Sequence, residues 1–297
     1  MPLQIDMPND AASIELDEYI ETIASMKYDL SCQEDLVDSA IYLKRLANNK
    51  KFLINHMSNE LREIASFQKT NTYGPAVFIL HSNENYFLRA VVWNPVSRIE
   101  RSIENFRYDI CHDHNFDILT VGYCGPGYES RGYTYDYSKV KGLLGEKVEL
   151  QPQELFTLSQ GRVALFRAKQ DIHIQLPPGS VSVSLNLIPR SNKINEPQYQ
   201  FDEATHRICR YLHSSGRELA VRLAGALGDE NAVEILETIY KNNPSAHVKA
   251  YAAQSLIQLD PQRTEEVAER IQGDSALAFD IFQKERMRYG SSFELYA

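Results

Sequence analysis

The amino-acid sequence predicts an α+β protein in which an antiparallel β-barrel or sandwich lies between two helical regions. Two observations indicate this class. Apolar residues recur every three or four positions near both ends of the chain, whereas the middle alternates with a period of two or forms short apolar runs. The changes of period predict an N-terminal helical region over 1–72, a barrel over 73–192 and a C-terminal helical region over 193–297.

The N-terminal region has the apolar spacing of amphipathic helices. Leu16, Tyr19, Ile20 and Ile23 fall on one helical face, and similar patterns recur further along the region. We therefore expect three helices before the first strand. The segment 71–75, Asn-Thr-Tyr-Gly-Pro, interrupts the pattern, because glycine and proline favour turns.

The middle of the chain is predicted to form about ten short strands, separated by turns such as 124–127 and 177–179. No helical pattern lies between these strands, and this absence favours antiparallel pairing in a sandwich or barrel. The expected strands are 77–80, 86–93, 106–111, 118–123, 128–137, 147–150, 154–158, 162–167, 171–175 and 181–188.

The C-terminal region returns to helical periodicity and predicts five or six short helices. A faint repeat of 32 residues resembles the helix pairs of HEAT repeats: it superimposes Leu219, Ala220, Ala224 and Leu227 on Tyr251, Ala252, Leu256 and Leu259. Such helices cover exposed sheet edges, build a homodimer interface or bind a protein partner, and we favour the first two roles.

Composition and charge exclude several classes of function. The net charge is −9 and the basic residues are scattered, so nucleic-acid binding is not expected as a main function. The chain shows neither an export signal at its start nor an apolar run long enough to span a bilayer, so we expect a cytoplasmic protein without membrane contact. The four cysteines have no CxxC spacing and fit a reducing compartment.

Two histidines with one residue between them are the strongest chemical signal. Successive side chains of an extended strand point to opposite faces, so His112 and His114 share a face while Asp113 points away. A third imidazole, His173, comes from a later strand and can complete a facial set of metal ligands. Asp117 follows closely enough for a turn to bring its carboxylate to the same centre.

These residues resemble the two motifs of the cupin family. The first motif is His-x-His, a gap, an acidic residue and a strand ending in glycine; 112–117 followed by 118–123 is similar, with a shorter gap and Asp instead of Glu. The second motif resembles Gly161 with the apolar strand after it, then His173, then a strand with a late Asn186.

The resemblance covers roughly residues 75–190 and implies a small cupin-like β-barrel, or jelly roll, with a divalent transition metal in its mouth. The implied ligands are His112, His114 and His173, with Asp117 either a fourth ligand or a base beside the metal. Fe(II) is the expected metal, with Mn(II) and Zn(II) as alternatives.

A facial histidine set leaves open positions at which ferrous iron can activate dioxygen beside a bound substrate. The leading hypothesis is therefore a mononuclear non-haem iron oxygenase, either a dioxygenase or a hydroxylase. Histidine at the position two after His112, where 2-oxoglutarate enzymes have a carboxylate, favours direct oxygenation. The alternatives are a non-catalytic cupin sensor with a partner-binding helical arm, and an oxygen-independent isomerase or lyase.

Arginines, tyrosines and one glutamine are the candidates for contacts with a small-molecule substrate. An arginine inside an apolar strand is costly to bury unless it meets an anion. Such an arginine binds a substrate carboxylate or pairs with a structural acid. The candidate substrate-binding residues are Arg167, Arg89, Tyr123, Tyr133 and Tyr135, and Gln175 joins Asp117 as a candidate catalytic residue because it shares the strand face of His173.

Overall fold

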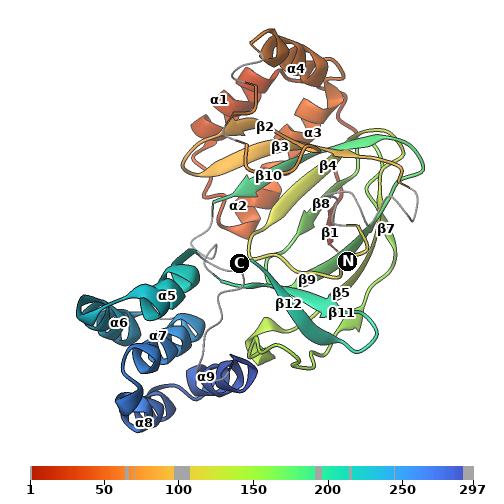
Figure 1. Ribbon diagram of the computed structural model, residues 1–297. Coiled ribbons are helices and arrows are strands. Elements are labelled where there is room, and N and C mark those ends of the chain that lie inside the picture. Colours follow the sequence, from red (N-terminus) through yellow and green to blue (C-terminus); the bar gives the residue numbers. More distant parts are fainter. Residues whose placement is uncertain are drawn as a thin grey trace. The chain divides into compact units, whose positions relative to one another are not determined.

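The computed structural model describes residues 2–63, 67–69, 71–96, 108–190, 196–213, 216–243 and 245–289 (Figure 1). The contacts within the chain divide it into two compact units, and each is described by itself. The first contains Met1–Val140, Lys147–Ile194 and Gln198–Arg210; the second contains Lys141–Glu146, Asn195–Pro197 and Tyr211–Ala297. The predicted strand 106–111 lies partly outside the described residues.

The first unit begins with a short strand and a group of helices. The helices are α1 (Leu16–Met26), α2 (Gln33–Asp38), α3 (Ala40–Asn48) and α4 (Phe52–Arg62). The sequence predicted three helices here. The described part has one more because only Ser39 separates α2 from α3, so the two read as one apolar pattern.

An antiparallel sheet of six strands lies beside these helices (Figure 1). Its order is β1 (Leu3–Ile5), β8 (Val163–Phe166), β4 (Ile118–Cys124), β10 (Ser182–Pro189), β3 (Tyr86–Trp93) and β2 (Val77–Ser82). Both faces of its central strands are buried. This explains why the sequence of β4 is a nearly continuous apolar run, whereas β10 alternates apolar residues with small polar ones.

A second antiparallel sheet is built around β5 (Glu129–Thr134). It pairs with β6 (Gln151–Pro152), β7 (Phe156–Thr157) and β9 (Asp171–Leu176). The α+β class with antiparallel sheets is thus confirmed. Among the described strands the two sheets are open, so a closed barrel or jelly roll stays a prediction.

Two apolar layers cover the faces of the six-stranded sheet. On one face, Leu88, Leu119 and Leu187 pack with buried residues of α1, α2 and α3. On the other face, Trp93 and Phe166 pack against Phe156 of the second sheet. Side chains alternate along each strand, so neighbouring residues lie in different layers. Every second residue of β3, β4 and β10 therefore faces the space between the sheets.

Residues 198–213 form two strands where the sequence pattern predicted helix. They are β11 (Gln198–Asp202) and β12 (Arg207–His213), which pair with each other. Tyr199 and Phe201 are both 2% exposed. The alternating aromatic pattern covers only a few residues, and a strong helical pattern follows it along the chain. The helical prediction therefore extended over these two strands.

The second unit is helical, with its own apolar core. Its helices are α5 (Gly216–Leu227), α6 (Glu230–Asn242), α7 (Ala246–Leu259), α8 (Thr264–Asp274) and α9 (Ala276–Tyr289). The central helix is α7, and its buried residues Tyr251, Ala252 and Leu256 contact the others. The relation to HEAT repeats stays a prediction.

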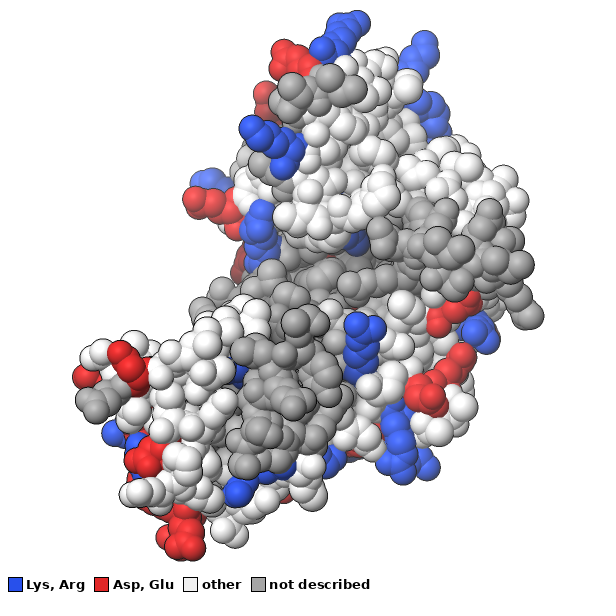
Figure 2. All heavy atoms as spheres, in the orientation of Figure 1, with Lys and Arg blue, Asp and Glu red and all other residues white. Residues whose placement is uncertain are grey.

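The surface and the helix lengths add two observations. On the face drawn in Figure 2, Lys and Arg side chains are interspersed with Asp and Glu side chains. Within the described ranges, no helix combines the length and the apolar character needed to cross a bilayer.

The packing of β4 against the N-terminal helices gives a test of the fold. Leu119 is 0% exposed, so Leu119→Ala leaves a cavity and should lower the free energy of unfolding by about 2–5 kcal/mol. Leu155→Ala is the matched control, because Leu155 is 55% exposed and should change stability by less than about 0.5 kcal/mol. Urea denaturation measures both; equal losses would contradict the layer assignment.

Candidate metal centre

The segment that carries His112 and His114 is irregular and is held between two strands. The main chains of His112 and His173 exchange hydrogen bonds of 3.1 and 2.9 Å, which ties the segment to β9. On its other side, Asp113 N–H donates to Tyr199 O at 3.2 Å and Phe201 N–H donates to Cys111 O at 2.8 Å. The segment therefore bridges β9 and β11.

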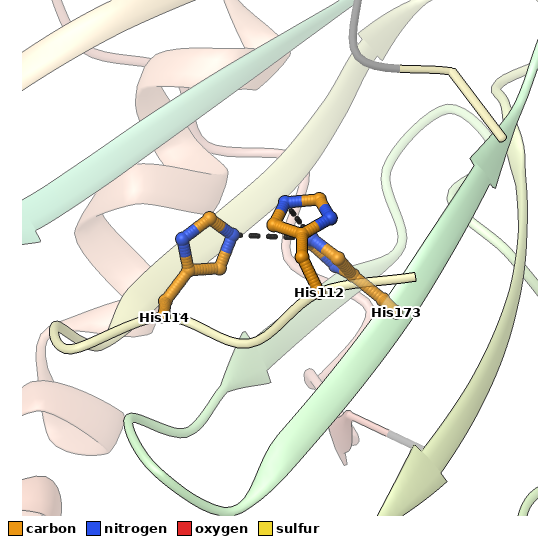
Figure 3. A group of neighbouring side chains, drawn as sticks. All are labelled: His112, His114 and His173. Atoms are coloured by element: carbon orange, nitrogen blue, oxygen red, sulfur yellow. Dashed lines mark hydrogen bonds between the residues drawn. The ribbon is translucent and has the colours of Figure 1, made fainter. Parts of the chain in front are cut away.

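Three imidazole rings converge from these two segments (Figure 3). His173 Nε2 lies 3.1 Å from His114 Nε2 and 3.2 Å from His112 Nε2. Metal–nitrogen bonds of about 2.1 Å place neighbouring ligand nitrogens about 3.0–3.4 Å apart. The described residues thus contain a three-histidine group whose spacing suits a metal ion, as the sequence predicted.

Hydrogen bonding and packing fix how the rings face one another. His112 Nδ1 lies 2.8 Å from Ile110 O, and because a carbonyl only accepts, Nδ1 carries the proton and Nε2 presents a lone pair. The His114 ring packs on Phe116 and the His173 ring on Phe166, with ring centroids 4.9 and 4.6 Å apart.

Burial disfavours the charged form of two of the rings. It lowers the pKa of His114 well below its ordinary value, and His112, His173 and Arg89 lower that pKa further. Burial likewise lowers the pKa of His173, with His112 as the second cause. Metal ions bind neutral imidazole. The lowered pKa values of His114 and His173 therefore favour the form that can coordinate a metal.

The donor set fits a divalent transition metal. His173 Nε2 is within hydrogen-bond distance of both other Nε2 atoms, yet a neutral ring has at most one proton there to donate. His173 Nε2 therefore cannot donate a full hydrogen bond in both contacts. A metal ion satisfies all three lone pairs at once, and neutral nitrogen ligands suit iron, zinc and related metals.

Asp117 lies outside the three-histidine group. Its Oδ1 accepts a hydrogen bond of 2.7 Å from Ala168 N–H, and its charge raises the pKa of Arg167. The carboxylate therefore supports the turn between β8 and β9. Its predicted role as ligand or base stays a prediction.

The two candidate arginines have different surroundings. Arg167 donates to both carboxylate oxygens of Asp171, at 2.9 Å from Nε and 2.7 Å from Nη2. Arg89 pairs with no carboxylate among the described residues; its buried Nε has no hydrogen-bond partner there, and its side chain interacts with Tyr73. Its guanidinium lies 5.0 Å from the centre of the Tyr73 ring.

Arg89 faces the space between the sheets, in one row with other polar residues. Strand register places it beside Asn186, which pairs on its other side with Thr120. Thr120 Oγ1 donates to Asn186 Oδ1 at 2.5 Å. This row lines the inner face of the six-stranded sheet.

Tyr128 and Gln175 lie between the sheets as well. Burial raises the pKa of the Tyr128 phenol, while a hydrogen bond from Gln175 and the charge of Arg89 lower it. Tyr128 also packs on Trp93, with ring centroids 4.1 Å apart. Gln175 was predicted from its position two after His173, whereas Tyr128 and Asn186 were not predicted as site residues.

The three predicted substrate tyrosines lie elsewhere. Tyr123 donates to Asn49 O at 3.1 Å under the N-terminal helices, on the other face of the sheet from the space that Arg89 enters. Tyr133 Oη is 3.1 Å from Glu203 Oε1, and Tyr135 Oη donates to Asp113 Oδ2 at 2.7 Å. The structure therefore does not bring these three phenols together with the histidines.

Comparisons with known proteins find distant likenesses only. No protein-family model matches the chain, and no curated protein matches it in sequence. Two hydroquinone 1,2-dioxygenase structures are similar in part. One, in complex with Cd2+ and 4-hydroxybenzonitrile, is 13% identical, with 42% of this chain and 71% of that chain covered and a TM-score of 0.27.

The other, from Sphingomonas sp. TTNP3, is 11% identical over 41% of this chain and 69% of that one, with a TM-score of 0.28. A prolyl 4-hydroxylase from Phytophthora capsici is 14% identical over 82% and 75%, with a TM-score of 0.25. TM-scores this low do not establish a shared fold.

Removal of one ring tests the metal site. His173→Ala deletes a direct ligand, so affinity for a divalent metal should fall by more than the roughly 10–100-fold typical of residues that only support a ligand. His56→Ala, on α4, should leave the affinity unchanged. Calorimetric titration of the metal-free proteins measures both; retained affinity in His173→Ala contradicts the site.

Proposed function

We propose that this protein is a mononuclear non-haem iron oxygenase that acts on a small, carboxylate-bearing substrate. The observation that carries the proposal is the convergence of the buried His112 and His173 and the partly buried His114 in a donor set suited to a transition metal. Three protein ligands leave coordination positions open, as catalytic metal sites require.

The three histidines would hold Fe(II), with Mn(II) and Zn(II) as alternatives. Ferrous iron in such a site supplies the activation of dioxygen, which no side chain can provide. The chain's own contribution is a largely apolar enclosure: Phe116 and Phe166 pack on the ligand rings and exclude water from them.

The space between the sheets supplies groups that would bind the substrate. Of the two candidate arginines, Arg89 has no carboxylate partner among the described residues, and a buried guanidinium is stabilised by a charge-assisted hydrogen bond to an anion. Tyr128 and Gln175 would orient the rest of the molecule. Arg167 already pairs with Asp171, so we assign the carboxylate contact to Arg89.

The cupin resemblance adds to this proposal. His112 and His114 precede β4, and His173 lies in β9, which is the order that the two motifs imply. Two antiparallel sheets that share an apolar layer are compatible with a barrel of this type. Cytoplasmic location, a homodimer and the absence of nucleic-acid or membrane partners remain proposals from the sequence.

Oxygen consumption tests the function. Protein reconstituted with ferrous iron under anaerobic conditions should consume dioxygen when a panel of amino acids and small carboxylic acids is supplied in air-saturated buffer. The same protein loaded with zinc should not, because zinc has no redox chemistry. Turnover of a panel member without oxygen would favour the isomerase or lyase, and tight binding without turnover would favour the sensor.

The carboxylate contact has its own test. Arg89→Met removes a charged hydrogen-bond donor, so kcat/KM for an acidic substrate should fall about 10–100-fold. Arg131→Met is the matched control, because Arg131 pairs with Glu203 at 3.3 Å and its side chain is 49% exposed. Steady-state oxygen uptake measures both variants; equal effects would contradict the assignment to Arg89.

A further inference from the structure

A buried carboxylate lies on the side of the histidine segment away from the metal centre. Asp113 is 0% exposed and stands between the two ligands His112 and His114 in sequence. Its Oδ2 accepts from Tyr135 Oη at 2.7 Å, and its Oδ1 accepts from Tyr199 N–H at 2.6 Å. The carboxylate therefore joins the ligand segment to β11 and to the residue that follows β5.

The positive partner of Asp113 comes from the turn that leads into β9. Lys169 Nζ lies 3.8 Å from Asp113 Oδ2, and the lysine side chain is 7% exposed. The ammonium group also lies 4.7 and 4.9 Å from the ring centres of Tyr137 and Tyr199. The same lysine donates its main-chain N–H to His114 O at 2.9 Å.

Lys169 adopts an unusual backbone conformation, with φ of 57°. This left-handed region is unfavourable for a residue with a Cβ, so surrounding contacts must hold it. Lys169 has such contacts through both its main chain and its side chain, and both reach the 112–114 segment. Lys169 lies four residues before His173. It therefore links this turn to the segment that carries His112 and His114.

Stability alone does not account for this arrangement. A buried ion pair stabilises a fold little more than apolar side chains of similar volume would, because both charges lose their hydration. Its most firmly supported benefit is that it specifies one arrangement of the chain. Here the specified arrangement is the position of two ligands relative to the third.

We propose that Asp113, Lys169 and Tyr135 form a positioning cluster that sets the placement of His112 and His114 against His173. This inference rests on the metal centre of the proposed function but not on the reaction. Asp113 is adjacent to both ligands, so movement of its carboxylate changes the direction of both imidazoles. None of the three residues is itself in the three-histidine group.

Metal affinity and cobalt spectra test the positioning cluster. Asp113→Asn and Lys169→Met should each weaken Co(II) binding by about 10–100-fold, as is typical when support of a ligand is lost. Each should also shift the visible absorption bands of bound Co(II), which report the coordination geometry. Glu203→Gln is the matched control: it removes the charge that pairs with Arg131, outside the positioning cluster, and should change neither quantity.

The double variant Asp113→Asn/Lys169→Met separates positioning from simple stabilisation. Removing both charges should restore stability to urea, because no unpaired buried charge remains. If the cluster positions the ligands, Co(II) affinity stays weak in the double variant. An affinity that recovers together with stability overturns the inference, as does wild-type affinity in the single variants.

Two further results complete the design. If Asp113→Asn fails to fold, Tyr135→Phe removes a single hydroxyl contact and should give the same spectral shift with a smaller loss of affinity; an unchanged spectrum then overturns the inference. Wild-type protein that binds Co(II) but, with iron, consumes no oxygen contradicts the proposed function and leaves the positioning cluster intact. A wild type that binds no metal overturns both.

Discussion

The contact of three imidazole nitrogens in a buried site is the constraint on which the first unit depends. His112 and His173 are 2% and 3% exposed, so water cannot satisfy their ring nitrogens freely. Main-chain hydrogen bonds between the two residues fix their separation, and the Ile110 carbonyl fixes one tautomer. The chain therefore holds three ring nitrogens close together, an arrangement that a bound cation would stabilise.

The two-layer architecture makes a polar interior possible. Leucines on one face of the six-stranded sheet pack on the N-terminal helices. The other face combines apolar residues such as Trp93 and Phe166 with Arg89, Thr120 and Asn186, which are expensive to bury and lie opposite Tyr128 and the histidines. The polar groups therefore lie on only one face of these strands.

Local patterns predicted much of the fold and the grouping of three histidines, and non-local contacts explain the rest. The spacing of His112 and His114, with the strand around His173, was sufficient to predict that group. Tyr133 and Tyr135 were assigned to the substrate because the inward face of their strand was not known. The exposed Glu129 and Arg131 on the same face indicate that Tyr133 points outward, whereas Tyr135 lies beyond the end of β5 and is buried against Asp113. Tyr128 occupies the opposite face.

The contacts of Asp113 with Lys169 and Tyr199 join residues far apart in sequence, and no local pattern predicts them. They also bear on the order of events during synthesis. His112 and His114 leave the ribosome well before Tyr199 and Phe201, whose strand completes the main-chain hydrogen bonds of their segment. The nascent chain therefore has all three histidines before β11 is available to hold the segment that carries two of them.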